Sequence, residues 1–135
     1  MFFCLIPEII KNITGENLDK YLSNKFYLPM GLSTTFNPLN KYNIEKIVPT
    51  EIDNNFRKEL IQGTVHDETA AIMGGISANA GLFSNAEDLS VILKMILNKG
   101  IYNNEQMIDS ETLELFTKNH INNDSLNNRG LGFDK

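Results

Sequence analysis

The sequence predicts a mainly α-helical chain with long loops. Apolar residues recur at helical spacing in four segments, whereas residues 33–62 show no regular period and contain several Asn and Pro residues. Only residues 129–135 alternate like the beginning of a strand, and a single strand cannot form a sheet. Either the domain is mainly helical, or the residues of its sheet lie outside these 135 residues.

The first two predicted helices form a pair. The first begins near Leu5, because Pro7 is tolerated only in the first turn of a helix, and it ends at Gly15. Asn17 is the expected N-cap of the second helix, whose apolar face extends to Phe26. The sequence LPMGL then ends this helix.

The most regular helix is predicted between a capping-box sequence, Ser84-Asn85-Ala86-Glu87, and Gly100. Its buried stripe is expected to comprise Leu89, Ile92, Leu93, Ile96 and Leu97. Both boundaries therefore follow from local signals.

A fourth helix is predicted to begin at a cap formed by Asp109 or Ser110. Its inward side is expected to carry Leu113 and either Leu115 or Phe116. Residues 119–128 are rich in Asn and are predicted to form a polar loop.

Charge and composition argue against several classes of protein. The net charge is −5, with acidic and basic residues interspersed, which argues against a nucleic-acid partner or a charged membrane surface. The single cysteine, Cys4, excludes an internal disulfide framework and a zinc site built on cysteines. The apolar start, MFFCLIPEII, is far shorter than the roughly 20 residues of a transmembrane helix and lacks the pattern of a signal peptide.

The stretch from residue 63 to 84, GTVHDETAAIMGGISANAGLFS, is the most unusual part of the sequence. Gly74, Gly75 and Gly81 are expected to serve a conformational purpose, either a positive φ angle or room for a neighbouring backbone. No phosphate-binding pattern of glycines is present, so nucleotide binding is not predicted.

The triplet His66, Asp67 and Glu68 raises the question of a metal site, with His120 as a distant partner. In an extended loop, adjacent side chains point to alternate sides, so His66 and Glu68 would converge while Asp67 faced away. Two convergent ligands do not make a site, and the HExxH spacing is absent. A hydrogen-bonded loop is the preferred interpretation, and no metal is predicted.

Pairs of carboxylates for glycoside hydrolysis can be drawn from Asp67, Glu68, Glu87 and Asp88. Glu87 and Asp88 fall in the first turn of a predicted helix, where the helix dipole already favours acidic side chains. A structural role therefore suffices for that pair.

Local signatures of a nucleophilic serine are absent. Neither Gly-x-Ser-x-Gly nor Ser-x-x-Lys occurs, and Ser90 and Lys94 are one residue too far apart for the second pattern. A literal Tyr-x-Asn occurs at Tyr102-Asn103-Asn104, directly after the helix end at Gly100, and is interpreted as a turn.

The order of three motifs resembles the serine beta-lactamase-related hydrolases, a family that includes class C beta-lactamases, DD-peptidases and similar esterases. The first motif is EIIKNITGENLDKYLSNKFYLPMGLSTTF, which is similar to a helix pair of the family. The second is GTVHDETAAIMGGISANAGLFSNAEDLSVILKMILNKG, the longest and most specific of the three. The third, RGLGFDK, resembles the strand-forming segment that follows.

The resemblance implies a partial domain. Residues 1–135 would correspond to the helical subdomain of the α/β beta-lactamase and DD-peptidase-like fold, truncated at both ends and without most of the antiparallel sheet. Family enzymes carry a Ser-x-x-Lys nucleophile and base and a Tyr-containing element before this part, and a Lys-Thr-Gly or His-x-Gly element after it. The resemblance thus implies no catalytic residue in this chain and no activity of the chain alone.

The resemblance also implies a chemistry for intact relatives. Their serine attacks an amide, lactam or ester carbonyl, the substrate is a small molecule or peptidoglycan-like, and no cofactor is expected; such proteins often act in the cell envelope or outside the cell. His66, Asp67 and Asn79 are the residues expected to line the cleft, although many relatives have a His in or near the stretch Ser77–Ala80. The alternative is a non-catalytic binding module or a pseudoenzyme of the same fold.

Overall fold

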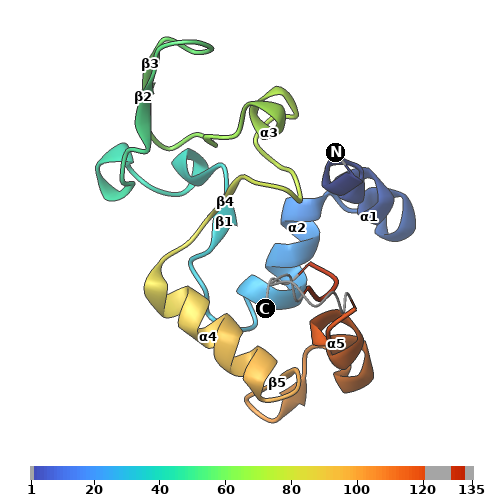
Figure 1. Ribbon diagram of the computed structural model, residues 1–135. Helices are drawn as coiled ribbons and strands as arrows, with labels where there is room; N and C mark the ends of the chain where they lie inside the picture. The colour runs from blue at the N-terminus through green and yellow to red at the C-terminus, as the bar shows by residue number, and fades with distance from the viewer. Residues whose placement is uncertain (1, 121–128, 133–135) are drawn as a thin grey trace. The chain divides into compact units, whose positions relative to one another are not determined.

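The computed structural model describes residues 2–120 and 129–132 and divides the chain into two compact units, Met1–Asp88 and Leu89–Lys135. Figure 1 shows the helices and strands of both units. Within the described ranges, no helix combines the length and the apolar character needed to cross a membrane.

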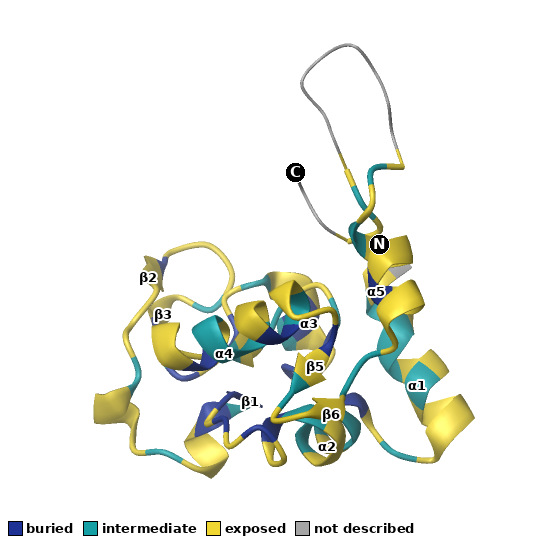
Figure 2. Ribbon diagram, turned by 90° about the horizontal axis from the view of Figure 1, so that it is seen from below, coloured by how far each residue is buried: buried dark blue, intermediate teal, exposed yellow. Residues whose placement is uncertain are grey.

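The first unit begins with the predicted helix pair. A 3₁₀ turn at Phe2–Leu5 leads into α1, Ile6–Thr14, with Pro7 in its first turn as predicted. The helix ends at Gly15, whose φ of 77° lets its N–H donate to the carbonyl oxygen of Lys11. No residue of α1 is buried, and Figure 2 accordingly shows this helix without dark blue.

The second helix of the pair is α2, Leu18–Leu22, and it continues as a π-helical turn, η2, at Ser23–Tyr27. Asn17 caps α2 as predicted: its side-chain oxygen accepts a hydrogen bond of 2.8 Å from the Lys20 N–H. Burial and the nearby charge of Asp19 raise the pKa of the Tyr27 hydroxyl to about 12. The second helix and its π-helical turn supply Leu18 and Tyr27 to the apolar core of this unit, and the segment that follows supplies Met30 and Leu32.

The rest of the first unit consists of short elements. They are β1 (Thr35–Phe36), η3 (Pro38–Asn40), η4 (Ile44–Lys46), β2 (Glu51–Asp53), β3 (Glu59–Ile61), α3 (Glu68–Ile72) and β4 (Leu82–Phe83). The expectation of at most short elements between residues 33 and 62 is thus confirmed. The sequence pattern did not reveal the strands, because elements of two or three residues are too short to show a period.

Two antiparallel ladders organise these elements. β1 pairs with β4, with Thr35 opposite Phe83. β2 and β3 form a hairpin whose loop is closed by Asp53, because the carboxylate of Asp53 accepts three backbone N–H groups, from residues 55, 56 and 57, at 2.9 Å each. These bonds also hold the pKa of Asp53 below its ordinary value.

Asp88 connects the segment before β1 to the beginning of α4, Ala86–Leu97. It is only 8% exposed, and its Oδ2 accepts from the Ser33 N–H at 2.8 Å, the Ser33 hydroxyl at 2.9 Å and the Thr34 hydroxyl at 2.8 Å. The Asp88 N–H in turn donates to the side chain of Asn85 at 2.9 Å.

The cap of α4 lies one residue later than the capping box predicted. Asn85 accepts the bond that the box assigned to Ser84, and the Ser84 hydroxyl is paired with the Thr34 hydroxyl at 2.8 Å instead. The shift arises because Asp88, at the third helical position, is held by Ser33 and Thr34, and this tertiary contact fixes where the helix starts.

The second unit contains α4 from Leu89 onward, a hairpin of β5 (Ile101–Tyr102) and β6 (Glu105–Gln106), and α5 (Ser110–Thr117). The predicted turn at Tyr102-Asn103-Asn104 is confirmed, since Asn103 and Asn104 have φ angles of 48° and 65°, typical of a type I′ hairpin turn. Asp109 caps α5 as predicted, because its carboxylate accepts from the Thr112 N–H at 2.8 Å.

The predicted buried stripe of α4 is wrong in part. Met95 is the buried residue, at 3% exposure, and Leu97 is 81% exposed. The other two leucines of the predicted stripe, Leu89 and Leu93, are also exposed, while Ile92 and Ile96 are half-buried. The helix has apolar residues on more than one face, so its period could not identify the face that packs.

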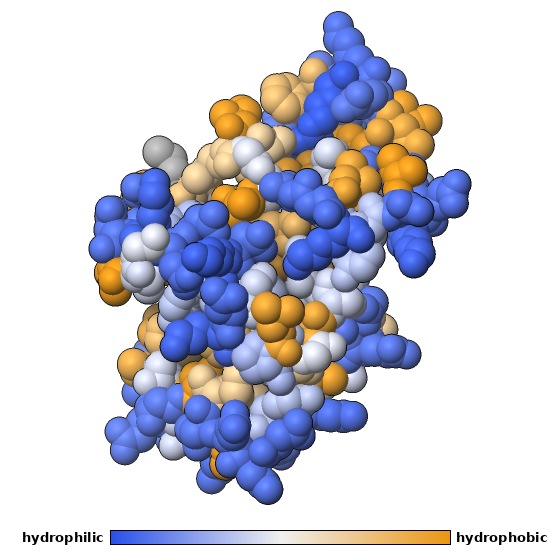
Figure 3. Space-filling view, turned by 180° about the vertical axis from the view of Figure 1, so that it is seen from behind, coloured by the Kyte–Doolittle hydropathy of each residue, from blue (hydrophilic) through white to orange (hydrophobic). Residues whose placement is uncertain are grey.

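In α5, Leu113 is buried as predicted, but Leu115 and Phe116 are both largely exposed. Apolar side chains reach the surface in several separate patches on the face drawn in Figure 3. Of the predicted polar loop, residues 121–128 lie outside the described residues, as do residues 133–135 of the predicted strand. In the described part of that strand, the Arg129 carbonyl accepts a hydrogen bond of 2.9 Å from the His120 N–H.

Replacing Asp88 with Ala is expected to destabilise the first unit. Three donors then lose a charged acceptor. Hydrogen bonds to charged groups contribute about 1.5–3 kcal/mol each, but neighbouring bonds are not additive, so we expect the free energy of unfolding to fall by about 3 kcal/mol. Urea unfolding measures this loss. Glu111→Gln, at an exposed first-turn position of α5, is the matched control and should change little; equal losses for the two variants would contradict the role of Asp88.

Asp88 also predicts a pH dependence. Burial raises the pKa of this carboxyl, but the hydrogen bonds from Thr34 and Ser33 outweigh it, so the folded pKa lies below the ordinary value of 3.8. The stabilisation is therefore complete above pH 3.8 and is lost as the pH falls through the folded pKa. Unfolding midpoints of the parent chain should fall over this acidic range, whereas those of Asp88→Ala should fall less.

Candidate functional site

The segment 63–84 leaves strand β3, forms α3 and a glycine-rich turn, and returns through β4. Asp67 fixes its first half, because the Asp67 carboxylate caps α3 by accepting the Ala70 N–H at 2.7 Å. α3 begins at Glu68, so the loop is not extended there. The prediction is wrong in part: His66 and Glu68 do line a common hollow, but Asp67 lines it with them and does not face away.

The structure brings Asp67 and Asn79 together. The Asn79 amide nitrogen donates to Asp67 Oδ1 at 3.1 Å, and the buried Ser77 hydroxyl, 2% exposed, donates to Asn79 Oδ1 at 2.5 Å. The thiol of Cys4 lies 3.6 Å from the same Asn79 oxygen. One side chain, Asn79, thus joins the helix cap, the glycine-rich turn and the segment that precedes α1.

His66 faces a different set of partners. Its Nε2 lies 3.4 Å from Oε1 of Glu51 on β2, and its backbone carbonyl accepts a hydrogen bond of 3.2 Å from the guanidinium of Arg57. The ring is about half exposed. His66 therefore belongs to the side of the segment that faces the β2–β3 hairpin, whereas Asp67 and Asn79 bond to each other.

The pKa of the Asp67 carboxyl lies below its ordinary value. The N–H of Ala70 is the main cause, the amide of Asn79 is the second, and the positive charge of protonated His66 adds a smaller effect. Asp67 is consequently a carboxylate at neutral pH and can accept hydrogen bonds but not donate a proton.

Two hollows adjoin this segment. One, of about 300 Å³, is strongly polar and is lined by Glu51, Asp53, His66, Asp67, Glu68 and Thr69. The other, of about 340 Å³, is lined by Thr50, Thr64, Val65, His66, Asp67, Ala80, Gly81, Leu82 and Phe83. His66 and Asp67 line both. Within the part of the chain that is described, no three His, Cys, Asp or Glu side chains form a group that could hold a metal ion.

The glycines have the conformational purpose predicted for them. Gly75 and Gly81 have φ angles of 84° and 106°, which side chains rarely adopt. A Cβ atom would also clash with the side-chain oxygen of Asn37 at Gly75, and with the Gly75 carbonyl at Gly81. The turn therefore folds back on itself closely enough to place Asn79 beside Asp67.

The partners of these side chains were not found from the sequence. Ser77 lies only two residues from Asn79, a spacing that allows a local hydrogen bond, but nothing in the pattern pointed to Glu51 or Cys4, which lie 15 and 75 positions from their partners. Ser90 and Lys94 both lie in α4, in the second unit.

Comparisons with known proteins found relatives of similar sequence and one solved structure of similar fold. It is 39% identical over 128 residues to a protein of Escherichia coli (strain K12) provisionally named D-alanyl-D-alanine carboxypeptidase, covering 85% of this chain and 30% of that protein. It is also 39% identical over 128 residues to the N-acetylmuramyl-L-alanine amidase of Bacillus subtilis (strain 168), covering 85% and 29%. The chain thus spans about 30% of the length of these curated relatives.

A solved structure shares the fold. The octameric penicillin-binding protein homologue from Pyrococcus abyssi matches with a TM-score of 0.65 and 21% identity, over 98% of this chain and 28% of the other. No protein-family model matches the chain.

Asn79→Ala is expected to raise the pKa of Asp67 part of the way to its ordinary value, because one of two main stabilising hydrogen bonds is removed while the Ala70 N–H stays. The carboxyl chemical shift of Asp67, followed by NMR against pH, measures the change. Asn55→Ala, at an exposed position of the β2–β3 loop, is the control and should leave this pKa where it is. An unchanged pKa in Asn79→Ala would show that the bond between the two side chains does not form.

Proposed function

Because this chain belongs to the serine beta-lactamase-related hydrolase family over the stretch that it shares with its relatives, we propose that it is part of an amide hydrolase acting on peptidoglycan-type peptides. The observation that carries the proposal is the 39% identity to two proteins over 128 residues. The names of both describe hydrolysis of an amide bond at an alanine residue. An alanine-containing peptide is therefore the substrate class proposed here.

The proposed reaction is acyl transfer to a serine. The hydroxyl oxygen attacks the carbonyl carbon, the C–N bond breaks, the leaving amine takes a proton, and water then hydrolyses the acyl-enzyme. Within these 135 residues there is no Ser-x-x-Lys, Lys-Thr-Gly or His-x-Gly sequence. The nucleophile and its base would accordingly be supplied by residues outside this sequence, and residues 1–135 would form a partial domain, the helical subdomain of the complete fold.

The segment 63–84 is proposed to form one wall of the substrate cleft. Asn79 is exposed, and only one hydrogen of its amide group is used by Asp67, so the second remains to donate to a substrate carbonyl. Asp67 sets the orientation of that amide, because it accepts from the same nitrogen while its own position is fixed by α3. His66 would face the cleft with a ring whose other contact is Glu51.

The chain by itself is expected not to hydrolyse nitrocefin or a p-nitrophenyl ester, since covalent catalysis requires the serine that these residues lack. Initial rates with the purified chain should equal those of buffer alone, with the full-length Escherichia coli relative as the positive control. Turnover that is abolished by a serine-directed inhibitor would overturn the proposal that the nucleophile lies elsewhere.

A chimera tests the wall directly. When residues 1–120 of this chain replace the matching part of the Escherichia coli relative, Asn79→Ala should lower kcat/KM for a D-alanyl-D-alanine peptide about tenfold, which corresponds to about 1.4 kcal/mol of lost transition-state binding. Asn55→Ala is the matched control and should leave kcat/KM unchanged. A folded chimera in which both variants retain full activity would contradict the proposal that Asn79 contacts the substrate in the cleft.

A further inference from the structure

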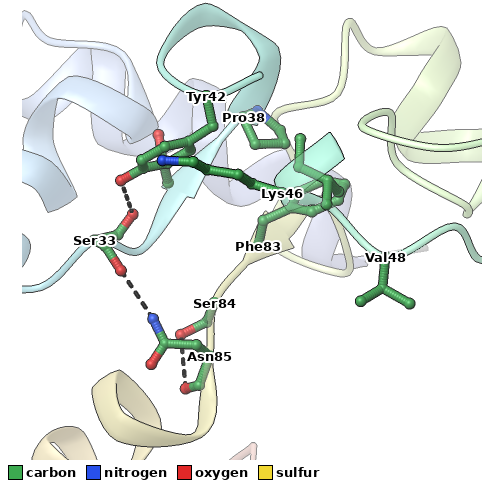
Figure 4. A pocket seen from close by; sticks show the side chains of 10 residues that line it. Ser33, Pro38, Tyr42, Lys46, Val48, Phe83, Ser84 and Asn85 are labelled. Atoms are coloured by element: carbon green, nitrogen blue, oxygen red, sulfur yellow. Dashed lines mark hydrogen bonds between the residues drawn. The ribbon is translucent and has the colours of Figure 1, made fainter. Parts of the chain in front are cut away.

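Another hollow of the first unit is lined by none of His66, Asp67 and Asn79. It has a volume of about 540 Å³, within the range of small-molecule sites (Figure 4). Its lining consists of Ser33, Thr35, Pro38, Tyr42, Lys46, Ile47, Val48, Phe83, Ser84 and Asn85. We call it the Lys46 pocket.

The framework of the Lys46 pocket is tied together by hydrogen bonds. The Tyr42 hydroxyl donates to the Ser33 carbonyl at 3.0 Å, and the Asn85 amide donates to the Ser33 hydroxyl at 2.9 Å. Thr35 and Phe83 face each other in the β1–β4 ladder. The pocket is thus built from three separate segments whose mutual positions are fixed without a ligand.

The segment that carries Lys46 is also fixed. The side-chain amide of Gln62 donates to the carbonyls of Ile44, at 3.1 Å, and Ile47, at 2.7 Å, and so holds the ends of the turn on which Lys46 lies. An ammonium group on a flexible stem therefore projects from a rigid base.

The lining combines an apolar surface, four uncharged polar residues and one cation. Pro38, Ile47 and Val48 and the rings of Tyr42 and Phe83 provide the apolar surface, and Lys46 is the only charged residue among the ten that line the pocket. No carboxylate of the described chain forms an ion pair with Lys46, although the chain has a net charge of −5. An apolar surface beside a single unpaired cation complements a monoanion that carries an apolar group.

We propose that the Lys46 pocket binds a small carboxylate bearing an apolar or aromatic group. The carboxylate pairs with the Lys46 ammonium, and the apolar group packs against Phe83 and Val48. A phosphate dianion is a poorer match, because one lysine supplies one positive charge and the pocket offers no second cation. Phe83 and Ser84 end the segment proposed as the cleft wall, but this binding does not depend on the proposed hydrolase function, since Lys46 and Val48 lie outside that segment and His66, Asp67 and Asn79 do not line the pocket.

NMR titration of the full 135-residue chain, labelled with ¹⁵N, tests the proposal with three probes of one shape: 3-phenylpropionate, 3-phenylpropanamide and 3-phenylpropylamine. The acid should shift amide signals of residues 33–48 and 83–85, the neutral amide should bind more weakly at the same place, and the amine should bind least. Equal affinity for acid and amide, or shifts spread over the whole chain, would overturn the proposal.

Two pairs of variants locate the contacts. Lys46→Gln should weaken the affinity for the acid two- to fivefold, as expected for an exposed ion pair, and leave the affinity for the amide unchanged. Lys41→Gln, which changes an exposed lysine outside the lining, should leave both affinities unchanged. Val48→Asp should abolish acid binding, because Val48 is 83% exposed and the change brings a negative charge into the pocket without disturbing the core.

Ile72→Asp is the control for Val48→Asp, since Ile72 is 77% exposed and lies outside the lining. The thermal unfolding midpoint provides a second measurement: the acid should raise it in the parent chain and in the control variants, and not in Val48→Asp. Similar effects of Lys46→Gln and Lys41→Gln, or unchanged binding in Val48→Asp, would contradict the proposal.

Discussion

The buried carboxylate of Asp88 is the contact on which the arrangement of the first unit depends. It accepts three hydrogen bonds from Ser33 and Thr34, two residues that lie immediately before β1 and more than 50 positions away in the sequence. Because an unpaired buried carboxylate is costly, the segment before β1 and the first turn of α4 have to meet. β1 and β4 then lie close enough to pair.

This junction has consequences on both sides of the β1–β4 ladder. On one side, Ser33, Thr35 and Phe83 become part of the Lys46 pocket, so that the pocket exists only where the ladder has formed. On the other, the ladder anchors the end of the segment 63–84, and the tight turn at Gly75 and Gly81 returns Asn79 to Asp67. A single buried charge thus supports two separate surfaces.

The polar residues of the segment 63–84 make two separate sets of contacts. The carboxylate of Asp67 accepts hydrogen bonds from the Ala70 N–H at the cap of α3 and from the Asn79 amide. It therefore orients the Asn79 side chain and does not donate a proton. His66 pairs with Glu51 on the β2–β3 hairpin. His66 and Asp67 therefore make different contacts, although both line one hollow with Glu68, and the amide of Asn79 is the group that we propose contacts a substrate.

The sequence by itself determined α1, α2, α4 and α5 but not α3, and it determined the caps at Asn17 and Asp109, the end of α1 at Gly15 and the turn at Asn103 and Asn104, because each of these depends on neighbours within about four residues. The order of the three motifs, through the family resemblance, also led to the prediction that Asp67 and Asn79 line the cleft. Only the tertiary structure decided the cap of α4, the exposed leucines of α4, the strand pairs and the partners of His66 and Asn79. These features depend on groups up to 75 positions apart, and a local pattern carries no information about which distant segment a side chain will meet.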